Sequence, residues 1–252
     1  MTVTKYSANG NDFVLFHTFI KKDRSELAKE LCHRQNGIGA DGLIVLVPHA
    51  KYDFEWQFYN SDGSEAEMCG NGSRACAHYA FVNNLADEKM SFLTQAGVIS
   101  AEVNSNMVLS ELTPPTILEK NIIYNNKKWI KVNTGVPHLV SFTDDIKKFD
   151  IQEARELRYK YNANVNIVYV DGNNLRVRTY ERGVEDETLA CGTGMAASFY
   201  VALLEKKVGE NIEVYPKSGD TLYLGINSKT ITFRGEVKKV FTCEFESKVE
   251  NF

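Results

Sequence analysis

The feature that most constrains this fold is an internal repeat. Met68–Gly72 (MCGNG) returns 122 residues later as Ala190–Gly194 (ACGTG). Two further pairs of blocks keep the same order at offsets of 121 and 125 residues: Phe58-Tyr59-Asn60 with Thr179-Tyr180-Glu181, and Gly10–Leu15 with Gly135–Val140. A nearly constant offset of this kind indicates a duplicated domain. We therefore expect two pseudo-symmetric halves whose cysteines face each other across a cleft.

The pattern along each half predicts more strand than helix. Apolar or alternating runs mark strands at 43–48, 54–59, 165–170 and 175–180, and the last two flank the turn Asp171-Gly172-Asn173-Asn174, which is typical of a hairpin. Helical spacing of apolar or small residues predicts helices at 24–33, 72–84, 152–161 and 194–206. Thr113-Pro114-Pro115 is the expected boundary, with an N-terminal half over 1–113, joined by the C-terminal strand 240–252, and a C-terminal half over 114–239.

Each repeat places a C-G-x-G sequence just before a helix. Glycines allow a tight turn, and the N-terminus of a helix presents N–H groups and partial positive charge. Such an end binds an anion, such as a carboxylate, and favours the thiolate of a neighbouring cysteine. Two cysteines on opposite sides of an α-carbon, one as thiolate and one as thiol, are the groups that an amino-acid racemase or epimerase needs. Phosphate loops of the G-x-G-x-x-G and Walker types are absent from the sequence.

Composition excludes several other classes of function. The net charge of -4, without a basic cluster, argues against nucleic-acid or anionic-membrane binding. The five cysteines are an odd number without a CxxC pair, and the five histidines lack metal-ligand spacing, so we expect reduced thiols and no metal. No signature of pyridoxal phosphate or nicotinamide binding is present, so no cofactor is expected. The N-terminal residues carry no apolar run, which predicts a cytoplasmic protein.

The repeat also selects polar residues for the site. His138 belongs to the block that matches Asn11, so it should lie near the cleft and modulate one cysteine. Glu181 stands where Asn60 stands in the first repeat, and Arg182 beside it could hold a distant carboxylate through paired hydrogen bonds. Amide contacts to a zwitterionic substrate are expected from Asn11, Asn60, Asn71 and Asn166, although asparagines beside glycine are often turn residues.

At these residues the sequence resembles the diaminopimelate epimerases along nearly its whole length. The blocks that carry the resemblance are Gly10–Phe13, Gly39–Gly42, Asn60–Gly72, Pro137-His138, Asn164–Asn166, Glu181–Gly183 and Ala190–Gly194. The resemblance implies an α/β fold of the α+β type, with two similar halves that each wrap a curled, mostly antiparallel sheet around a central helix. It implies interconversion of LL- and meso-diaminopimelate, a step toward lysine and cell-wall cross-links, without metal or pyridoxal phosphate. It also implies a homodimer.

The resemblance assigns roles residue by residue. It implies that Cys69 and Cys191 are the acid/base pair and that His138 and Glu181 modulate them. Substrate contacts are implied for the following residues: Asn11, Asn60, Gly70, Asn71, Asn166, Glu181, Arg182, Gly192 and Thr193.

Three departures from the family pattern bear on specificity. Many members have Gln at Gly42, Asn at Val136, and one residue fewer at Val184–Glu187. A racemase of another amino acid is therefore the alternative on this fold. A protein that senses oxidation through its two cysteines is the alternative from a different class.

Overall fold

The computed structural model describes residues 1–112, 114–227 and 230–249, so the expected boundary residue Thr113 lies outside the described residues. The chain forms two compact units. Unit 1 comprises Met1–Ser110 and the chain from Gly235 onward, and unit 2 comprises Glu111–Arg234. Strands dominate both units, as the sequence predicts.

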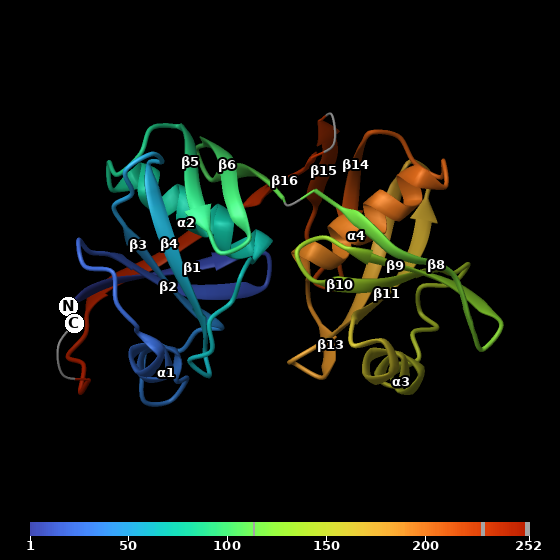
Figure 1. Ribbon diagram of the computed structural model, residues 1–252, viewed down its shortest axis with the longest axis horizontal. Helices are drawn as coiled ribbons and strands as arrows, with labels where there is room; N and C mark the ends of the chain where they lie inside the picture. Colours follow the sequence, from blue (N-terminus) through green and yellow to red (C-terminus); the bar gives the residue numbers. More distant parts are fainter. Residues whose placement is uncertain (113, 228–229, 250–252) are drawn as a thin grey trace. The chain divides into compact units, whose positions relative to one another are not determined.

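Unit 1 is built on one curled sheet (Figure 1). Its strands pair in the order β17-β1-β2-β3-β4-β5-β6-β7, and the pairs β2–β3 and β4–β5 are parallel whereas the others are antiparallel. The strands are β1 (Thr2–Ala8), β2 (Asn11–His17), β3 (Gly42–Val47), β4 (Phe54–Asn60), β5 (Lys89–Thr94), β6 (Gly97–Asn104), β7 (Met107–Glu111) and β17 (Lys238–Glu244).

Unit 2 repeats this topology with the same sequence of strand directions. Its order is β8-β9-β10-β11-β12-β14-β15-β16, in which β10–β11 and β12–β14 are the parallel pairs, and the short β13 pairs with β12. The strands are β8 (Thr116–Tyr124), β9 (Lys127–Asn133), β10 (Pro137–Phe142), β11 (Asn164–Asp171), β12 (Asn174–Glu181), β13 (Asp186–Thr188), β14 (Asn211–Tyr215), β15 (Leu222–Asn227) and β16 (Thr230–Glu236). The identical order of parallel and antiparallel pairs agrees with the duplication seen in the sequence.

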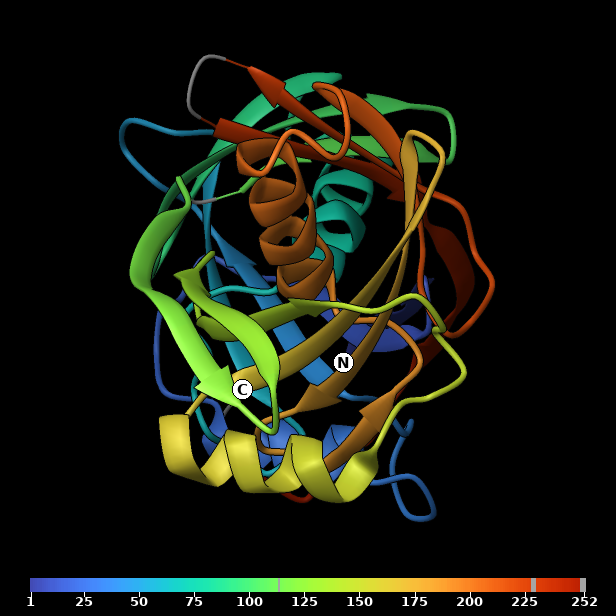
Figure 2. The ribbon, with the colours of Figure 1, turned by 90° about the vertical axis from the view of Figure 1, so that its right-hand side faces the viewer.

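Within the described ranges, each unit has one outer and one central helix. The outer helices, α1 (Ser25–Cys32) and α3 (Ile151–Tyr161), connect the parallel strands β2–β3 and β10–β11 and bury one apolar face against them. The central helices are α2 (Gly70–Val82) and α4 (Gly192–Leu204). In Figure 2, α4 (orange) lies inside a ring of strands while α3 (yellow) lies outside. Residues 70–80 of α2 are all buried, so this helix has no solvent-facing side over its first three turns.

Local sequence explains the ends of these elements. Asp150 caps α3 because its carboxylate accepts from the backbone N–H groups of Gln152 and Glu153. The β11–β12 hairpin turns at Gly172, whose φ of 62° suits glycine. The central helices begin at Gly70 and Gly192, two residues earlier than the sequence pattern predicts. The reason is that the cysteines themselves are the N-cap residues and the glycines lie within the first turn.

Candidate active site

In unit 1 the sulfur of Cys69 lies at the N-terminus of α2. Cys69 is the N-cap in an extended conformation, and its Sγ accepts from the backbone N–H of Gly72 at 3.3 Å. A Cβ atom at Gly72 would lie 3.2 Å from Ile44 Cδ1 and 3.3 Å from Cys69 Cβ, so a larger residue here would have to displace a neighbour by a few tenths of an ångström. The first turn of a helix also presents N–H groups that have no acceptor inside the helix. This end of α2 can therefore hold an anion beside the thiol.

A chain of amide hydrogen bonds places Asn71 and Asn11 beside this helix end. Asn71 is buried, and its Nδ2 donates to Asn11 Oδ1 at 2.6 Å. Asn11 Nδ2 donates in turn to Asp41 Oδ2 at 3.1 Å. The structure thus brings together four of the predicted site residues in unit 1: Asn11, Cys69, Gly70 and Asn71. Asn60 is different, because its amide donates to Ser64 Oγ at 3.0 Å within the turn after β4.

In unit 2 the sulfur of Cys191 occupies the matching position at the N-terminus of α4. Cys191 is 6% exposed, and its Sγ lies 3.6 Å from the hydroxyl of Thr193. The Thr193 hydroxyl is also 3.0 Å from Nε2 of His138, a fully buried side chain on β10. The backbone carbonyl of Thr193 accepts from Thr134 Oγ1 at 2.8 Å, which ties this helix end to the loop after β9.

The neighbours of His138 fix which ring nitrogen carries the proton. Asn166 Nδ2 donates to Leu139 O at 3.0 Å and lies 3.1 Å from His138 Nδ1. At Nε2 the nearer neighbour is Thr193 Oγ1 at 3.0 Å, and the amide nitrogen Asn164 Nδ2 is more distant at 3.4 Å. The shorter contacts therefore make Nδ1 the acceptor. Nε2 then carries the proton and donates to Thr193 Oγ1, which leaves the threonine hydroxyl hydrogen for Cys191 Sγ. His138 therefore reaches Cys191 through one intervening hydroxyl.

Glu181 and Arg182 follow one another at the end of β12. Both are partly exposed, and Glu181 pairs with Asp186 of β13 in the strand register. The backbone N–H of Arg182 donates to Asn164 Oδ1 at 2.7 Å, and its guanidinium lies 3.4 Å from two oxygens of Asn162. Burial and the Arg182 charge together lower the pKa of His138 to about 3. Arg182 therefore lies near enough to influence the residues around Cys191, which form the Cys191 half-site; the residues around Cys69 form the Cys69 half-site.

Comparisons with known proteins show which family the chain belongs to. The family model described as diaminopimelate epimerase matches residues 3–118 and 130–240. A diaminopimelate epimerase of a Nitratiruptor species is 62% identical, covering 96% of this chain and 97% of the relative. One of Campylobacter lari is 53% identical, covering 97% and 99%. The chain belongs to the diaminopimelate epimerase family. The family expected from the sequence motifs is thereby confirmed.

The fold extends to more distant proteins. A solved structure of a probable proline racemase from Agrobacterium radiobacter K84 superposes with a TM-score of 0.78 at 13% identity, covering 97% of this chain and 92% of that chain. This likeness concerns the fold alone. It supports the predicted class of curled sheets wrapped around central helices.

In this member of the diaminopimelate epimerase family, close packing explains why position 42 is a glycine. A Cβ atom there would lie 2.6 Å from Phe58 Cε2 and 2.8 Å from the carbonyl oxygen of Tyr59. Phe58 and the backbone of Tyr59 therefore occupy the space that a side chain at position 42 would need.

Some residues of the half-sites were missed by the sequence reasoning. Four of them bond directly to a predicted site residue: Arg74, Thr134, Asn164 and Thr179. The fifth, Asn9, bonds to Arg74. Asn164 and Asn166 alternate on one strand, so period-two spacing could have indicated that they share a face. The others depend on contacts between distant segments.

The described residues lack a metal-binding cluster and a membrane-spanning helix. In the described ranges, no three His, Cys, Asp or Glu side chains gather as metal ligands. None of the helices described is long and apolar enough to cross a membrane.

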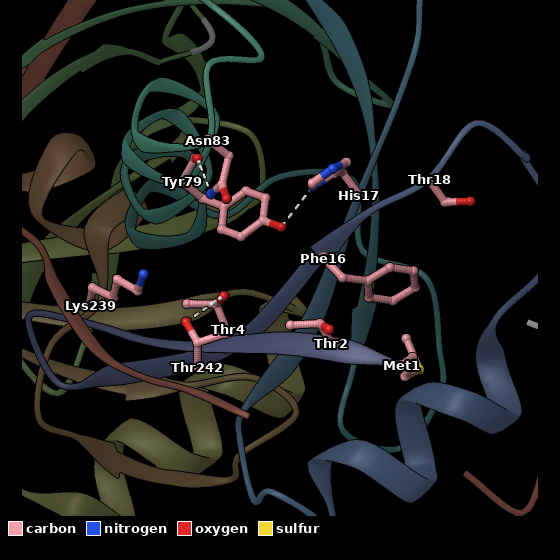
Figure 3. Close-up of a pocket in the computed structure, with 10 residues that line it drawn as sticks. All are labelled: Met1, Thr2, Thr4, Phe16, His17, Thr18, Tyr79, Asn83, Lys239 and Thr242. Carbon is pink, nitrogen blue, oxygen red and sulfur yellow. Dashed lines mark hydrogen bonds between the residues drawn. The ribbon is translucent and has the colours of Figure 1, made fainter. Parts of the chain in front are cut away.

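A pocket of about 440 Å³ in unit 1 lies away from the Cys69 half-site (Figure 3). Its walls come from β1, β2, β17 and the C-terminal part of α2, where His17 Nδ1 is 2.9 Å from the Tyr79 hydroxyl. Tyr79 is ten positions after Cys69, which at the rise of an α-helix is roughly 15 Å along its axis. This pocket therefore belongs to the other end of the central helix.

The burial of His138 predicts a pH dependence of stability. The folded state holds this ring neutral down to about pH 3, whereas the unfolded chain protonates it below its ordinary pKa of 6.5. The unfolded state thus binds more protons between these values, so stability falls as the pH falls through this window. The expected contribution to the slope is about 1.4 kcal/mol per pH unit.

Urea unfolding between about pH 6.5 and 4.5 measures this slope. In His138→Gln the slope should become shallower by about that amount, because glutamine does not titrate. The partly exposed residue His49 supplies the control, and His49→Gln should keep the wild-type slope. An equal slope in His138→Gln and wild type would contradict a neutral, buried imidazole.

Proposed function

We propose that the chain interconverts LL- and meso-2,6-diaminopimelate by two-cysteine proton transfer at the α-carbon, without a cofactor. The observation that carries this proposal is the C-G-x-G sequence at the N-terminus of a buried central helix in each of two units of equal topology. The names of the relatives at 62% and 53% identity support the substrate.

The proposed reaction divides the proton transfer between two sulfurs. One thiolate removes the α-proton from one face of the carbon, and the other thiol delivers a proton to the opposite face. The two cysteines exchange protonation states in each turnover, so the enzyme is then ready for the reverse reaction. The carbanion carries its charge into the α-carboxylate, which the N-terminal amides of α2 and α4 would stabilise.

The remaining predicted residues have supporting roles in this proposal. Asn11, Asn60, Asn71 and Asn166 contribute amide contacts, and Gly70, Gly192 and Thr193 contribute the backbone N–H groups that hold the α-carboxylate. Arg182 would bind the distant carboxylate, since its guanidinium is partly exposed and the backbone of this residue is fixed by Asn164. Glu181 and His138 would modulate the cysteines, and a neutral His138 acts through the Thr193 hydroxyl.

The first test is α-proton exchange in deuterated water, followed by NMR with reduced enzyme and no added cofactor. LL-diaminopimelate should lose its α-proton signal and the meso isomer should appear. Lysine, glutamate and histidine, tested beside it, should not exchange. Exchange of another amino acid would keep the mechanism and overturn the substrate, whereas no exchange with any compound would favour a thiol sensor.

The chain is expected to assemble with a second copy of itself. A homodimer is proposed, supported by the family resemblance and by Val240 and Phe241, which β17 leaves 46% and 43% exposed. Light scattering should then give about twice the chain mass of 28.4 kDa.

A cytoplasmic location is proposed because an acid/base pair of cysteines must remain reduced. Cell fractionation tests it.

A further inference from the structure

Arg74 is a fully buried arginine on the helix that carries Cys69. It lies one turn into α2 with 0% of its surface exposed. Its Nη2 donates to Asn71 Oδ1 at 2.8 Å and to Asn9 Oδ1 at 2.7 Å, and its Nη1 donates to the carbonyl oxygen of Gly70 at 3.3 Å. These bonds hold the guanidinium against the first turn of α2, where the sulfur of Cys69 also lies.

The charge of Arg74 is therefore placed in a poorly hydrated site next to an ionisable thiol. Burial lowers the pKa of Arg74 to about 9, and the charge of Cys69 acts in the opposite direction. Electrostatic interaction is mutual, so a guanidinium that is stabilised by a thiolate stabilises that thiolate equally. At neutral pH Arg74 remains charged.

The charged side chains on the strands around α2 are largely paired with opposite charges, and Glu67, two positions before Cys69, is exposed to solvent. Among the strands that pack on α2, β3 carries no charged residue in its sequence, and Glu102 of β6 is exposed and pairs with Lys89. A cluster of two cations and two carboxylates lies beyond Asn11: Lys5, Asp12, Arg34 and Asp41. The titratable residues farther along α2 are Cys76, His78 and Tyr79; burial raises the pKa of Cys76 and Tyr79 and lowers that of His78, which keeps all three uncharged.

Unit 2 has a different charge arrangement around its cysteine. The position that corresponds to Arg74, 122 residues later, is Ala196. His138 is held neutral by burial. The positive charge of Arg182 is partly exposed, so water and salt screen it more than they screen Arg74. The two half-sites therefore share a topology but do not favour the two thiolates equally.

We propose that Arg74 is a positioning residue that keeps Cys69 as the resting thiolate, while Cys191 rests as the thiol. This inference rests on the proposed function for its meaning in catalysis. In the first step the Cys69 thiolate forms an S–H bond as the α-C–H bond breaks. Cys191 then loses its S–H proton to the opposite face of the carbanion and becomes the thiolate.

The test is the pH profile of alkylation by iodoacetamide, measured on the reduced full-length protein without substrate. Mass spectrometry of the peptides follows Cys69 and Cys191 separately in the same sample. The midpoint for Cys69 should lie at least about one pH unit below that for Cys191, which is a ten-fold difference in thiolate ratio. Arg74→Met should raise the Cys69 midpoint by about one unit or more and leave that of Cys191 in place, and Arg74→Lys should restore most of the shift.

A second buried arginine of unit 1 provides the matched control. Arg24 is 3% exposed and donates to Gln57 Oε1 at 2.8 Å and to a loop carbonyl, away from α2. Arg24→Met should leave the Cys69 midpoint unchanged. If Arg74→Met does not fold, the wild-type midpoints and Arg74→Lys still decide the question.

The pH dependence of the epimerisation rate is a further measurement. If Arg74 only supported the fold, its replacement would not change the shape of this pH profile. In Arg74→Met the rate should fall most at low pH and recover toward wild type as the pH passes the new Cys69 midpoint. An equal loss at every pH, an unchanged Cys69 midpoint, or a Cys191 midpoint below that of Cys69 would each overturn the inference. Alkylation needs no substrate, so it separates failure of this inference from failure of the proposed function, which would appear as no exchange in wild type.

Discussion

Alanine at either Cys69 or Cys191 is expected to reduce the formation of meso-diaminopimelate from the LL isomer by about 10²- to 10⁴-fold, the range for loss of one acid/base group. Each sulfur serves one face of the α-carbon in the proposed reaction, so neither can replace the other. Each single variant, Cys69→Ala or Cys191→Ala, should show this loss of rate by itself. Chiral chromatography of the product measures them.

The control for this experiment is a cysteine outside both half-sites. Cys243 lies on β17 and is partly exposed, so Cys243→Ser should epimerise at the wild-type rate. Retained epimerisation in either Cys69→Ala or Cys191→Ala would rule out the two-base mechanism.

Gly194→Ala is expected to have the second large effect. Inside a helix this change normally adds stability, because alanine has the higher helix propensity. Here the new Cβ would lie 2.4 Å from Asn166 Oδ1 and 3.1 Å from Thr179 Oγ1. Asn166 is itself bonded to Leu139, His138 and Thr179, so it cannot move without breaking those bonds. We expect a loss of about 1–3 kcal/mol in the free energy of unfolding and slower epimerisation.

Urea unfolding of Gly194→Ala measures the loss of stability. A suitable control is Gly209→Ala, since the nearest atom to a Cβ there is Asn173 Oδ1 at an ordinary 3.4 Å. The control should remain within about 0.5 kcal/mol of wild type. A Gly194→Ala protein as stable as the control would show that the close approach to Asn166 does not constrain the helix.

The repeat made much of the fold predictable from the sequence. Matching C-G-x-G blocks indicated two equivalent units, and both central helices begin at those blocks. The exact starts were wrong by two residues, because glycine is a poor helix former and the pattern gave no sign that the cysteine is the cap. The hairpin at Gly172 was predictable because its turn residues are local.

The hydrogen-bond partners within each half-site were much less predictable. Arg74 stands in a run of small residues on α2, but its bond to Asn9 joins side chains 65 positions apart in the chain. Thr134 reaches the Thr193 carbonyl across 59 positions. Such contacts follow from the curvature of the sheet around the helix, which no local pattern specifies. Asn60 shows the opposite case, since its bond to Ser64 is the local turn that an asparagine near glycine favours.

The burial of α2 on all sides over its first three turns has a mechanical consequence. Most residues of these turns are small, so their apolar contacts alone would resist rotation about the helix axis or sliding along it only weakly. Directional bonds remove that freedom: Asn71 to Asn11, and Arg74 to Asn9, each join the helix to the loop or strand beside it. Near the C-terminal end, His78 bonds to Tyr6 and Tyr79 to His17. The rotational setting of Cys69 is thus determined by polar groups at both ends of the helix, while the small apolar residues between them supply packing. Conservative changes in the core should therefore lower the melting temperature long before they alter the direction in which the sulfur points.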